Sequence, residues 1–296
     1  MESKNESKKT IKKTIIEIKH LSHIYNAGTT FARAALDDIN LVIEAGEFIG
    51  MIGHTGSGKS TLIQHLNALL KPTSGQVLLE GVDIHGDKAR LKSVRQRVGL
   101  VFQYPEHQLF ETDIYKDVAF GPTNMGLTKE EVDKRVREAL NLVGLTEDLY
   151  EKSPFELSGG QKRRAAIAGV LAMKPEVLIL DEPTAGLDPA GRDAILGQIA
   201  DMHEKVGNTV ILVSHNMEDV SRLSDRIIVM AEGRVLLTGT PQEVFARPDK
   251  LKEVGLTPPP IAVLMDRLRE EGYNNIPPGI FTVEAAADVL AAQQKL

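Results

Sequence analysis

The sequence predicts an α/β fold, and three observations support that prediction. Short apolar runs recur along the chain, at residues 48–52, 177–180, 209–213 and 226–230. Runs of this length and composition are typical of strands that are buried on both faces of a parallel sheet. Residues 194–206 have a helical pattern between two of these runs, as expected of a crossover helix. Glycine-rich residues 53–58 join the first run to a helix-forming segment at residues 62–70.

The amino-terminal region predicts a second, antiparallel sheet. Residues 15–19 and 39–43 alternate between apolar and polar side chains, as strands with one buried face do. We expect this layer to lie against the parallel sheet and to carry Tyr25. Residues 1–14 precede it as a polar, lysine-rich tail.

The glycine-rich segment fits the pattern of a phosphate-binding loop (P-loop) at every required position. It comprises Gly53, His54, Thr55, Gly56, Ser57, Gly58, Lys59, Ser60 and Thr61. Glycines let backbone N–H groups converge on phosphate oxygens, and the positive end of the following helix dipole favours the same anion. We expect Lys59 to reach the β- and γ-phosphates of a nucleotide, and Ser60 to bind Mg²⁺ through its hydroxyl.

Residues 103–172 predict a helical subdomain. Thr128 and Glu131 fit a capping box, in which each side chain accepts a backbone N–H of the first helical turn. The helix that follows has one apolar face, formed by Val132, Val136, Leu140 and Val143. A second helix is predicted at residues 161–173.

Two carboxylates, Asp181 and Glu182, directly follow the apolar run 177–180. Because ligands bind at the carboxyl ends of parallel strands, we expect both side chains beside the γ-phosphate. Asp181 is predicted to hold Mg²⁺, directly or through water. Glu182 is predicted to orient and deprotonate the attacking water.

The last part of the chain, residues 241–296, predicts a helical extension. Residues 258–260 are three prolines, and helical patterns follow at 261–271 and 282–293. The first pattern has an apolar side, formed by Ile261, Leu264, Met265 and Leu268. This side either packs back on the rest of the chain or helps to hold a dimer together.

These motifs, with the residues that lie between them, resemble the ATP-binding-cassette (ABC) ATPases. Gln103 follows a strand-like segment, Asp188 ends the run Ala-Gly-Leu-Asp, and His215 follows the apolar run 209–213, in the order of that family. The resemblance implies an ABC ATPase domain at residues 15–240, built on a P-loop NTPase (RecA-like) core, that binds ATP and Mg²⁺ and hydrolyses ATP.

The resemblance also implies a role for each of these residues. Gln103 senses Mg²⁺ and the lytic water, His215 contacts the γ-phosphate, and Asp188 belongs to a loop that connects two ATP sites. Tyr25 matches the aromatic residue that stacks on adenine, with Phe31 as the alternative.

The run Leu-Ser-Gly-Gly-Gln at residues 157–161 matches the signature motif of the family. Ser158, Gly159 and Gly160 open a predicted helix, whose free N–H groups and dipole form an anion site. A nucleotide bound at the chain's own P-loop is not expected to reach this site. We therefore expect it, with Gln161, to bind ATP that another subunit presents.

Composition narrows the class of protein. The chain has 296 residues, no cysteine and a net charge of −6, which argues against a dedicated nucleic-acid binder. The basic run 162–164 is expected to face solvent or a partner subunit. No run of about 18 apolar residues occurs, so we expect membrane association through partner proteins alone.

Residues 104–110 and 117–122 resemble those of energy-coupling factor (ECF) transporters, in particular the second of their two ATPase subunits. This resemblance implies a peripheral protein on the cytoplasmic side of the cell membrane, paired with a related ATPase as a heterodimer. A transmembrane coupling subunit and a separate membrane subunit, which binds the vitamin or other micronutrient, complete the implied complex.

The same segment is the predicted docking place for the transmembrane partner. Leu109 and Phe110 would fill a groove for one of its helices, and Glu106 or Glu111 would pair with its arginines. The alternative is that Leu109 and Phe110 belong to the core of the helical subdomain.

Two other functions remain open. A cobalt or nickel uptake ATPase that works as a homodimer would share most of these motifs. A soluble ABC ATPase outside transport is the second alternative, although the chain lacks the long coiled-coil insertion of the DNA-repair type.

Overall fold

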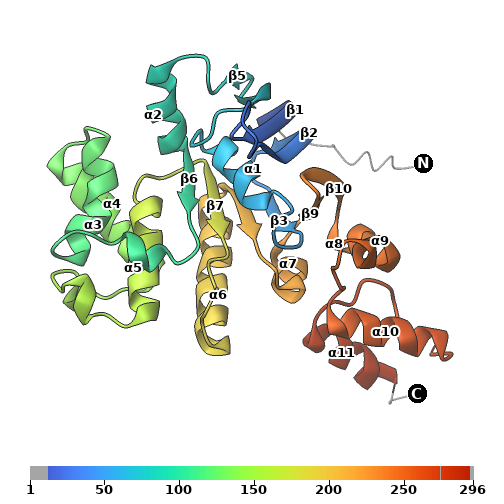
Figure 1. Cartoon of the computed structure of the whole chain (residues 1–296). Coiled ribbons are helices and arrows are strands. Elements are labelled where there is room, and N and C mark those ends of the chain that lie inside the picture. The colour runs from blue at the N-terminus through green and yellow to red at the C-terminus, as the bar shows by residue number, and fades with distance from the viewer. Residues whose placement is uncertain (1–12, 274, 294–296) are drawn as a thin grey trace, which may run out of the picture.

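The computed structural model describes residues 13–273 and 275–293, which form two sheets with helices around them (Figure 1). The larger sheet has six strands in the order β10-β9-β3-β8-β7-β6. These are β3 (Phe48–Ile52), β6 (Val98–Val101), β7 (Val177–Asp181), β8 (Thr209–Val213), β9 (Arg226–Ala231) and β10 (Arg234–Gly239). β3 pairs in parallel with β8 and β9, and β7 with β6 and β8, while β10 pairs antiparallel with β9. The predicted α/β fold with a largely parallel sheet is confirmed.

The smaller sheet is antiparallel, with the order β2-β1-β4-β5. Its strands are β1 (Thr14–Tyr25), β2 (Arg33–Glu44), β4 (Ser74–Leu79) and β5 (Val82–Asp83). Both predicted strands of this layer are confirmed, and both are longer than predicted. β1 already begins at Thr14, so the predicted tail ends earlier than residue 14, and its residues 1–12 lie outside the described residues.

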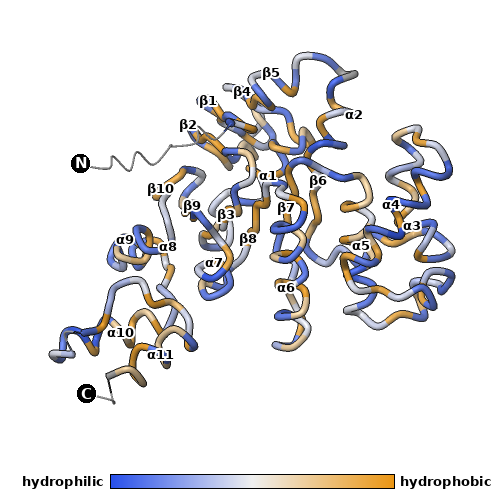
Figure 2. The backbone as a smooth tube through the Cα atoms, turned by 180° about the vertical axis from the view of Figure 1, so that it is seen from behind, coloured by the Kyte–Doolittle hydropathy of each residue, from blue (hydrophilic) through white to orange (hydrophobic). Residues whose placement is uncertain are grey.

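The larger sheet is buried on both faces, as its apolar strands require. In β7, Val177 and Ile179 lie in the hydrophobic cluster that includes β1 and β2. Leu178 and Leu180 lie in the cluster on the opposite face, among the helices. All four side chains are fully buried, and Figure 2 shows the hydrophobic colour of these central strands.

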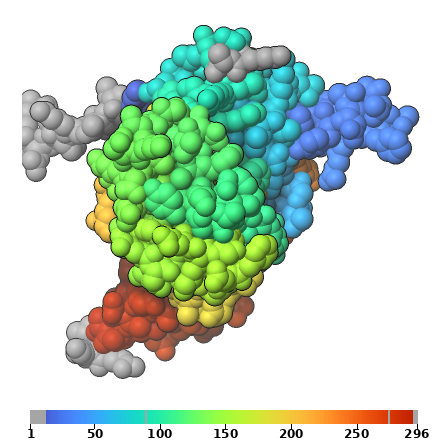
Figure 3. All heavy atoms as spheres, turned by 90° about the vertical axis from the view of Figure 1, so that its left-hand side faces the viewer, coloured from blue at the N-terminus to red at the C-terminus, as the bar shows by residue number. Residues whose placement is uncertain are grey.

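Helices form a separate layer beside the sheet, and Figure 3 shows the face that this layer presents. The layer contains α3 (Ile114–Asn124), α4 (Lys129–Leu142), α5 (Gly159–Leu171) and the 3₁₀ turns η1 (Pro105–Gln108), η2 (Glu147–Leu149) and η3 (Pro154–Glu156). The predicted apolar face of α4 is buried. The predicted capping box is only half formed: the Thr128 side chain accepts the Glu131 N–H, but Glu131 pairs with Arg135 instead of turning back.

Four helices lie closer to the sheets. They are α1 (Lys59–Leu66), α2 (Lys88–Arg97), α6 (Pro189–Val206) and α7 (Met217–Leu223). The crossover helix predicted at 194–206 is confirmed as part of α6. The helix predicted at 62–70 ends early, at Leu66, because Ala68 has a left-handed backbone (φ 56°) that a continuing helix does not allow.

The carboxyl-terminal extension contains α8 (Pro241–Phe245), α9 (Pro248–Glu253), α10 (Pro260–Glu270) and α11 (Val283–Gln293). Figure 1 shows these helices at the end of the molecule opposite α3 to α5. Met265 of α10 is buried in a cluster with Ile276, Ile280 and Ala286, whereas Leu264 is half-exposed. The apolar side of α10 therefore packs mainly within the extension itself. Among the described residues, no helix has the length and apolar character needed to cross a membrane.

Candidate nucleotide-binding site

The site lies where four neighbouring strands, β3, β8, β7 and β6, end at one edge of the larger sheet. Their parallel pairing brings together segments that are far apart in the sequence. A cavity of about 450 Å³ opens there. The predicted residues that line it are Tyr25, Thr55, Gly56, Gly58, Lys59, Ser60, Thr61, Gln103, Asp181 and Glu182.

The P-loop leads from β3 into α1, whose first residue is Lys59. Gly58 caps the helix with φ 101°, and a Cβ at this position would lie 2.7 Å from the carbonyl oxygen of Ala35. The backbone here requires glycine. The Lys59 ammonium donates to the carbonyl oxygens of Gly53 (2.6 Å) and His54 (3.1 Å). Burial lowers the pKa of Lys59, and the nearby carboxylates oppose this shift.

Ser60 and Asp181 meet beside the P-loop. The Ser60 hydroxyl donates to Asp181 Oδ2 at 3.2 Å, and burial raises the pKa of Asp181. A buried carboxylate, a hydroxyl and the Gln103 side chain at the same cavity form an oxygen donor set that fits Mg²⁺. No group of three or more His, Cys, Asp or Glu side chains in the described part of the chain could hold a metal by itself.

Glu182 and His215 form a close pair. Glu182 Oε2 lies 2.6 Å from His215 Nδ1, and the Glu182 side chain is largely buried while that of His215 is exposed. The Glu182 backbone is left-handed (φ 50°), and its N–H donates to the carbonyl oxygen of Val213 on β8. The base predicted from the sequence is thus held by its backbone and by the predicted histidine.

The two aromatic candidates for adenine stacking differ in position. Tyr25 lines the cavity, and its hydroxyl lies 3.2 Å from Thr61 Oγ1 at the start of α1. Phe31 is 80% exposed and does not line the cavity. The geometry favours Tyr25.

The signature segment lies elsewhere on the surface. Ser158 caps α5 with a complete capping box: its Oγ accepts the Gln161 N–H (3.3 Å), and its own N–H donates to Gln161 Oε1 (2.9 Å). A Cβ built at Gly159 or Gly160 would meet no atom within 4 Å. Asp188 caps α6 and is also exposed. None of these residues lines the cavity, so the structure does not bring them to this chain's own P-loop.

Three cavity residues were not predicted: Arg33, Ala34 and Ala35. Arg33 lines the cavity beside Gly56, because β1 and β2 pair in a register that sets Arg33 opposite Tyr25. It is an isolated arginine at the start of a strand and belongs to no motif. No sequence signal could have identified it.

Two expectations about charged residues are each wrong for one of the residues named: Arg163 in the run 162–164, and Glu106 in the alternative Glu106 or Glu111. Arg163 does not face solvent or a partner subunit: it is buried and makes a two-pronged ion pair with Glu106. Glu106 is therefore not free to pair with an arginine of another protein. Although burial opposes the shift, the Arg163 guanidinium holds the pKa of Glu106 below its usual value.

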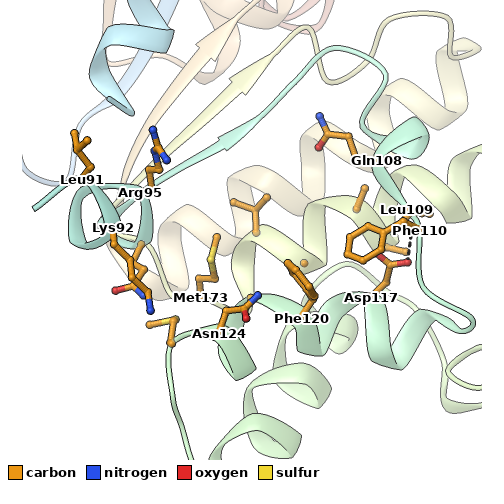
Figure 4. Close-up of a pocket in the computed structure, with 17 residues that line it drawn as sticks. Leu91, Lys92, Arg95, Gln108, Leu109, Phe110, Asp117, Phe120, Asn124 and Met173 are labelled. Carbon is orange, nitrogen blue, oxygen red and sulfur yellow. Dashed lines mark hydrogen bonds between the residues drawn. The ribbon is translucent and has the colours of Figure 1, made fainter. Parts of the chain in front are cut away.

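A second hollow, of about 860 Å³, lies between α2 and the helices α3 and α5 (Figure 4). Its walls include Leu109, Phe110 and Phe120. Phe110 is exposed and meets the Phe120 ring edge-to-face at 4.9 Å, whereas Leu109 packs against the helical core. The Asp117 carboxylate accepts the backbone N–H groups of Phe110 and Glu111, which fixes this segment. The core alternative is therefore confirmed for Leu109, while docking through the exposed Phe110 stays a prediction.

Residues 36–185 match the family model described as "ABC transporter". The energy-coupling factor transporter ATP-binding protein EcfA2 of Clostridium tetani is 57% identical over 272 residues, which are 92% of this chain and 94% of that protein. The structure of CbiO1 from Clostridium perfringens, described as part of the ABC transporter complex CbiONQ, matches with a TM-score of 0.73 at 42% identity, covering 86% of this chain and 99% of that one. A dimeric post-hydrolysis structure of an ATP-binding cassette, bound to ADP and Pi, matches with a TM-score of 0.69 at 30% identity, covering 77% and 99%.

Proposed function

Because this chain belongs to the family of energy-coupling factor transporter ATP-binding proteins, we propose that it hydrolyses ATP to power an importer of vitamins or other micronutrients. One observation carries the chemical part of this proposal. The hydroxyl of Ser60 and the carboxylates of Asp181 and Glu182 converge beside the P-loop, in one cavity.

Six residues of the cavity, and His215 beside Glu182, then have roles in ATP hydrolysis. Lys59 and the N-terminus of α1 bind the β- and γ-phosphates, while Tyr25 stacks on the adenine. Ser60, Gln103 and Asp181 would hold Mg²⁺, which neutralises charge on the phosphate oxygens. The Glu182 carboxylate accepts a proton from the attacking water, and His215, 2.6 Å away, orients that carboxylate and contacts the γ-phosphate.

The second half of each ATP site comes from another ATPase subunit. Ser158, Gly159 and Asp188 are exposed and lie outside the chain's own cavity, so they are free to meet ATP that a partner presents. A helix N-terminus with open N–H groups suits this role. The likeness to a dimeric ATP-binding cassette supports the arrangement. We infer a heterodimer with a related ATPase, in which ATP closes the pair and hydrolysis opens it.

The membrane partners dock on the helical layer. The hollow lined by Phe110 and Phe120 is large enough for side chains of a partner helix, and it adjoins the segment that follows Gln103. Movement of Gln103 toward the nucleotide would therefore displace the docking surface. In this proposal the chain lies at the cytoplasmic face of the cell membrane, held there by a transmembrane coupling subunit and a substrate-binding subunit.

The test is the variant Glu182→Gln in the complex with its membrane partners. ATP binding should persist, while turnover falls by at least about 100-fold because the amide cannot accept the proton. The control is Glu147→Gln, an exposed glutamate of η2 that should leave turnover unchanged. Turnover of Glu182→Gln at the parent rate would refute the assignment of the base.

A second candidate is an uptake ATPase for cobalt or nickel that pairs with itself. CbiO1, to which the chain is similar, is described as part of the ABC transporter complex CbiONQ. Purification from native membranes in mild detergent separates the two. A second, related ATPase among the co-purifying chains supports the heterodimer, and this chain as the sole ATPase supports the homodimer.

A further inference from the structure

A buried arginine near the start of α5 connects three segments of the chain. The Arg163 side chain is 3% exposed. Its Nε and Nη2 donate to the two carboxylate oxygens of Glu106, at 2.9 and 2.7 Å. Its Nη1 donates to the carbonyl oxygens of Pro183 (3.2 Å) and Ala185 (2.7 Å). The guanidinium also lies 5.9 Å from the centre of the Tyr104 ring.

Each of these partners lies within three positions of a residue of the ATP site. Glu106 lies in η1, three positions after Gln103. Pro183 directly follows Glu182, and Ala185 leads toward Asp188. One guanidinium thus joins the segment after Gln103 to the segment after Glu182, from a helix that begins at the signature.

The neighbours of Arg163 in the sequence do not share this position. Lys162 is partly exposed and lies 5.9 Å from the Phe155 ring. Arg164 is partly exposed and makes one long hydrogen bond, 3.4 Å, to the carbonyl oxygen of Gly144. Within the part of the chain that the structure describes, neither has a hydrogen bond or ion pair to the segments that Arg163 joins.

We propose that Arg163 is a positioning residue that transmits movement of residues 104–110 to residues 183–188, and so to Glu182. This inference rests on the proposed function. The planar guanidinium holds its donors in a fixed fork, so the groups bound to it cannot shift independently. Separating them would leave the Glu106 carboxylate buried without a partner, which is costly. The two segments therefore move together, and docking at residues 104–110 changes the position of the base.

The first test is Arg163→Lys in the complex with its membrane partners. Lysine keeps the charge but cannot serve the carboxylate and both carbonyls in the same geometry. We expect kcat for ATP hydrolysis to fall about tenfold or more, with KM for ATP within about twofold, because the base is misplaced while the P-loop is untouched. The matched control is Arg137→Lys, which alters an exposed guanidinium whose Nε donates to both carboxylate oxygens of Asp133 on α4, and it should change neither constant.

A second variant, Glu106→Gln, tests the inference in case Arg163→Lys fails to fold. Glutamine keeps the shape and one acceptor, so Arg163 retains its carbonyl contacts, and we expect a smaller fall in kcat with more ATP consumed per solute transported. The inference would be overturned if both variants kept the parent kcat and the parent number of ATP molecules consumed per solute transported. It would also be overturned if the melting temperature fell in both variants while kcat and that number stayed unchanged. If the parent complex itself hydrolyses no ATP, the proposed function fails, and the premise of this inference fails with it.

Discussion

Acidification will destabilise the chain through His65, a buried residue of α1. Its Nδ1 lies 2.8 Å from the carbonyl oxygen of Thr61, and its Nε2 has no hydrogen-bond partner among the described residues. The ring meets that of His23 edge-to-face at 4.7 Å. Burial lowers the pKa of His65 from 6.5 to about 4; the Thr61 carbonyl opposes the shift, and nearby His23 and His85 add to it.

The sign and size of the effect follow from these two pKa values. Between pH 6.5 and about 4, the unfolded chain binds a proton at His65 that the folded chain does not bind. The free energy of unfolding therefore falls as the pH falls through this window, and this residue contributes no pH dependence above it. The whole gap between the two values corresponds to about 3 kcal/mol.

The assay is urea unfolding at about pH 7, 5.5 and 4, for the parent and for His65→Gln. The parent should lose about 3 kcal/mol more than the variant across this range, since glutamine does not titrate. The control His107→Gln removes an exposed histidine of η1 and should follow the parent. Parallel pH profiles for the parent and His65→Gln would refute the reasoning.

Two further predictions concern nucleotide affinity and packing. Tyr25→Ala should weaken ATP binding about tenfold by loss of stacking on adenine, whereas Phe31→Ala should change it less than about twofold. Titration with ATP measures both affinities. A larger loss of affinity in Phe31→Ala than in Tyr25→Ala would assign adenine stacking to Phe31. Gly50→Ala in β3 would place a Cβ against Val220 of α7 and 2.5 Å from Ser224 Oγ. Overpacking of this kind should cost about 2 kcal/mol of unfolding free energy in urea, and an unchanged urea midpoint would show that α7 can move away.

The parts of the fold that the sequence predicted are those controlled by local chemistry. The apolar run 177–180 could be assigned to a buried strand because all of its side chains must avoid water, and the position of Asp181 and Glu182 followed from that assignment. The P-loop could be predicted for a similar reason. Gly58 occupies a backbone conformation with a carbonyl too close for a side chain, and that need is visible as glycine in the sequence.

The parts that were missed depend on contacts between distant segments. The run 162–164 reads as a solvated basic patch, and only the packing of α5 against η1 turns Arg163 inward. Glu106, named with Glu111 as a partner for arginines of another protein, instead pairs with Arg163 through the same packing. Arg33 enters the cavity through the pairing register of β1 and β2, which the pattern of either strand does not fix. The positions of Arg163, Glu106 and Arg33 therefore could not be predicted from the local sequence.

Side chains of β7 point alternately to the two faces of the sheet, and this limits which substitutions the strand can tolerate. Val177 and Ile179 must match the antiparallel sheet, while Leu178 and Leu180 must match the helical layer. A single strand of five residues is thus shared between two independent packing surfaces. A change of side-chain volume in either pair can be compensated within the layer that the pair faces. The other layer and the carboxylates at the strand's end are then not disturbed. If the membrane partner docks on the helical layer, as proposed, substitutions in that layer would adapt it to a new partner while hydrolysis is preserved.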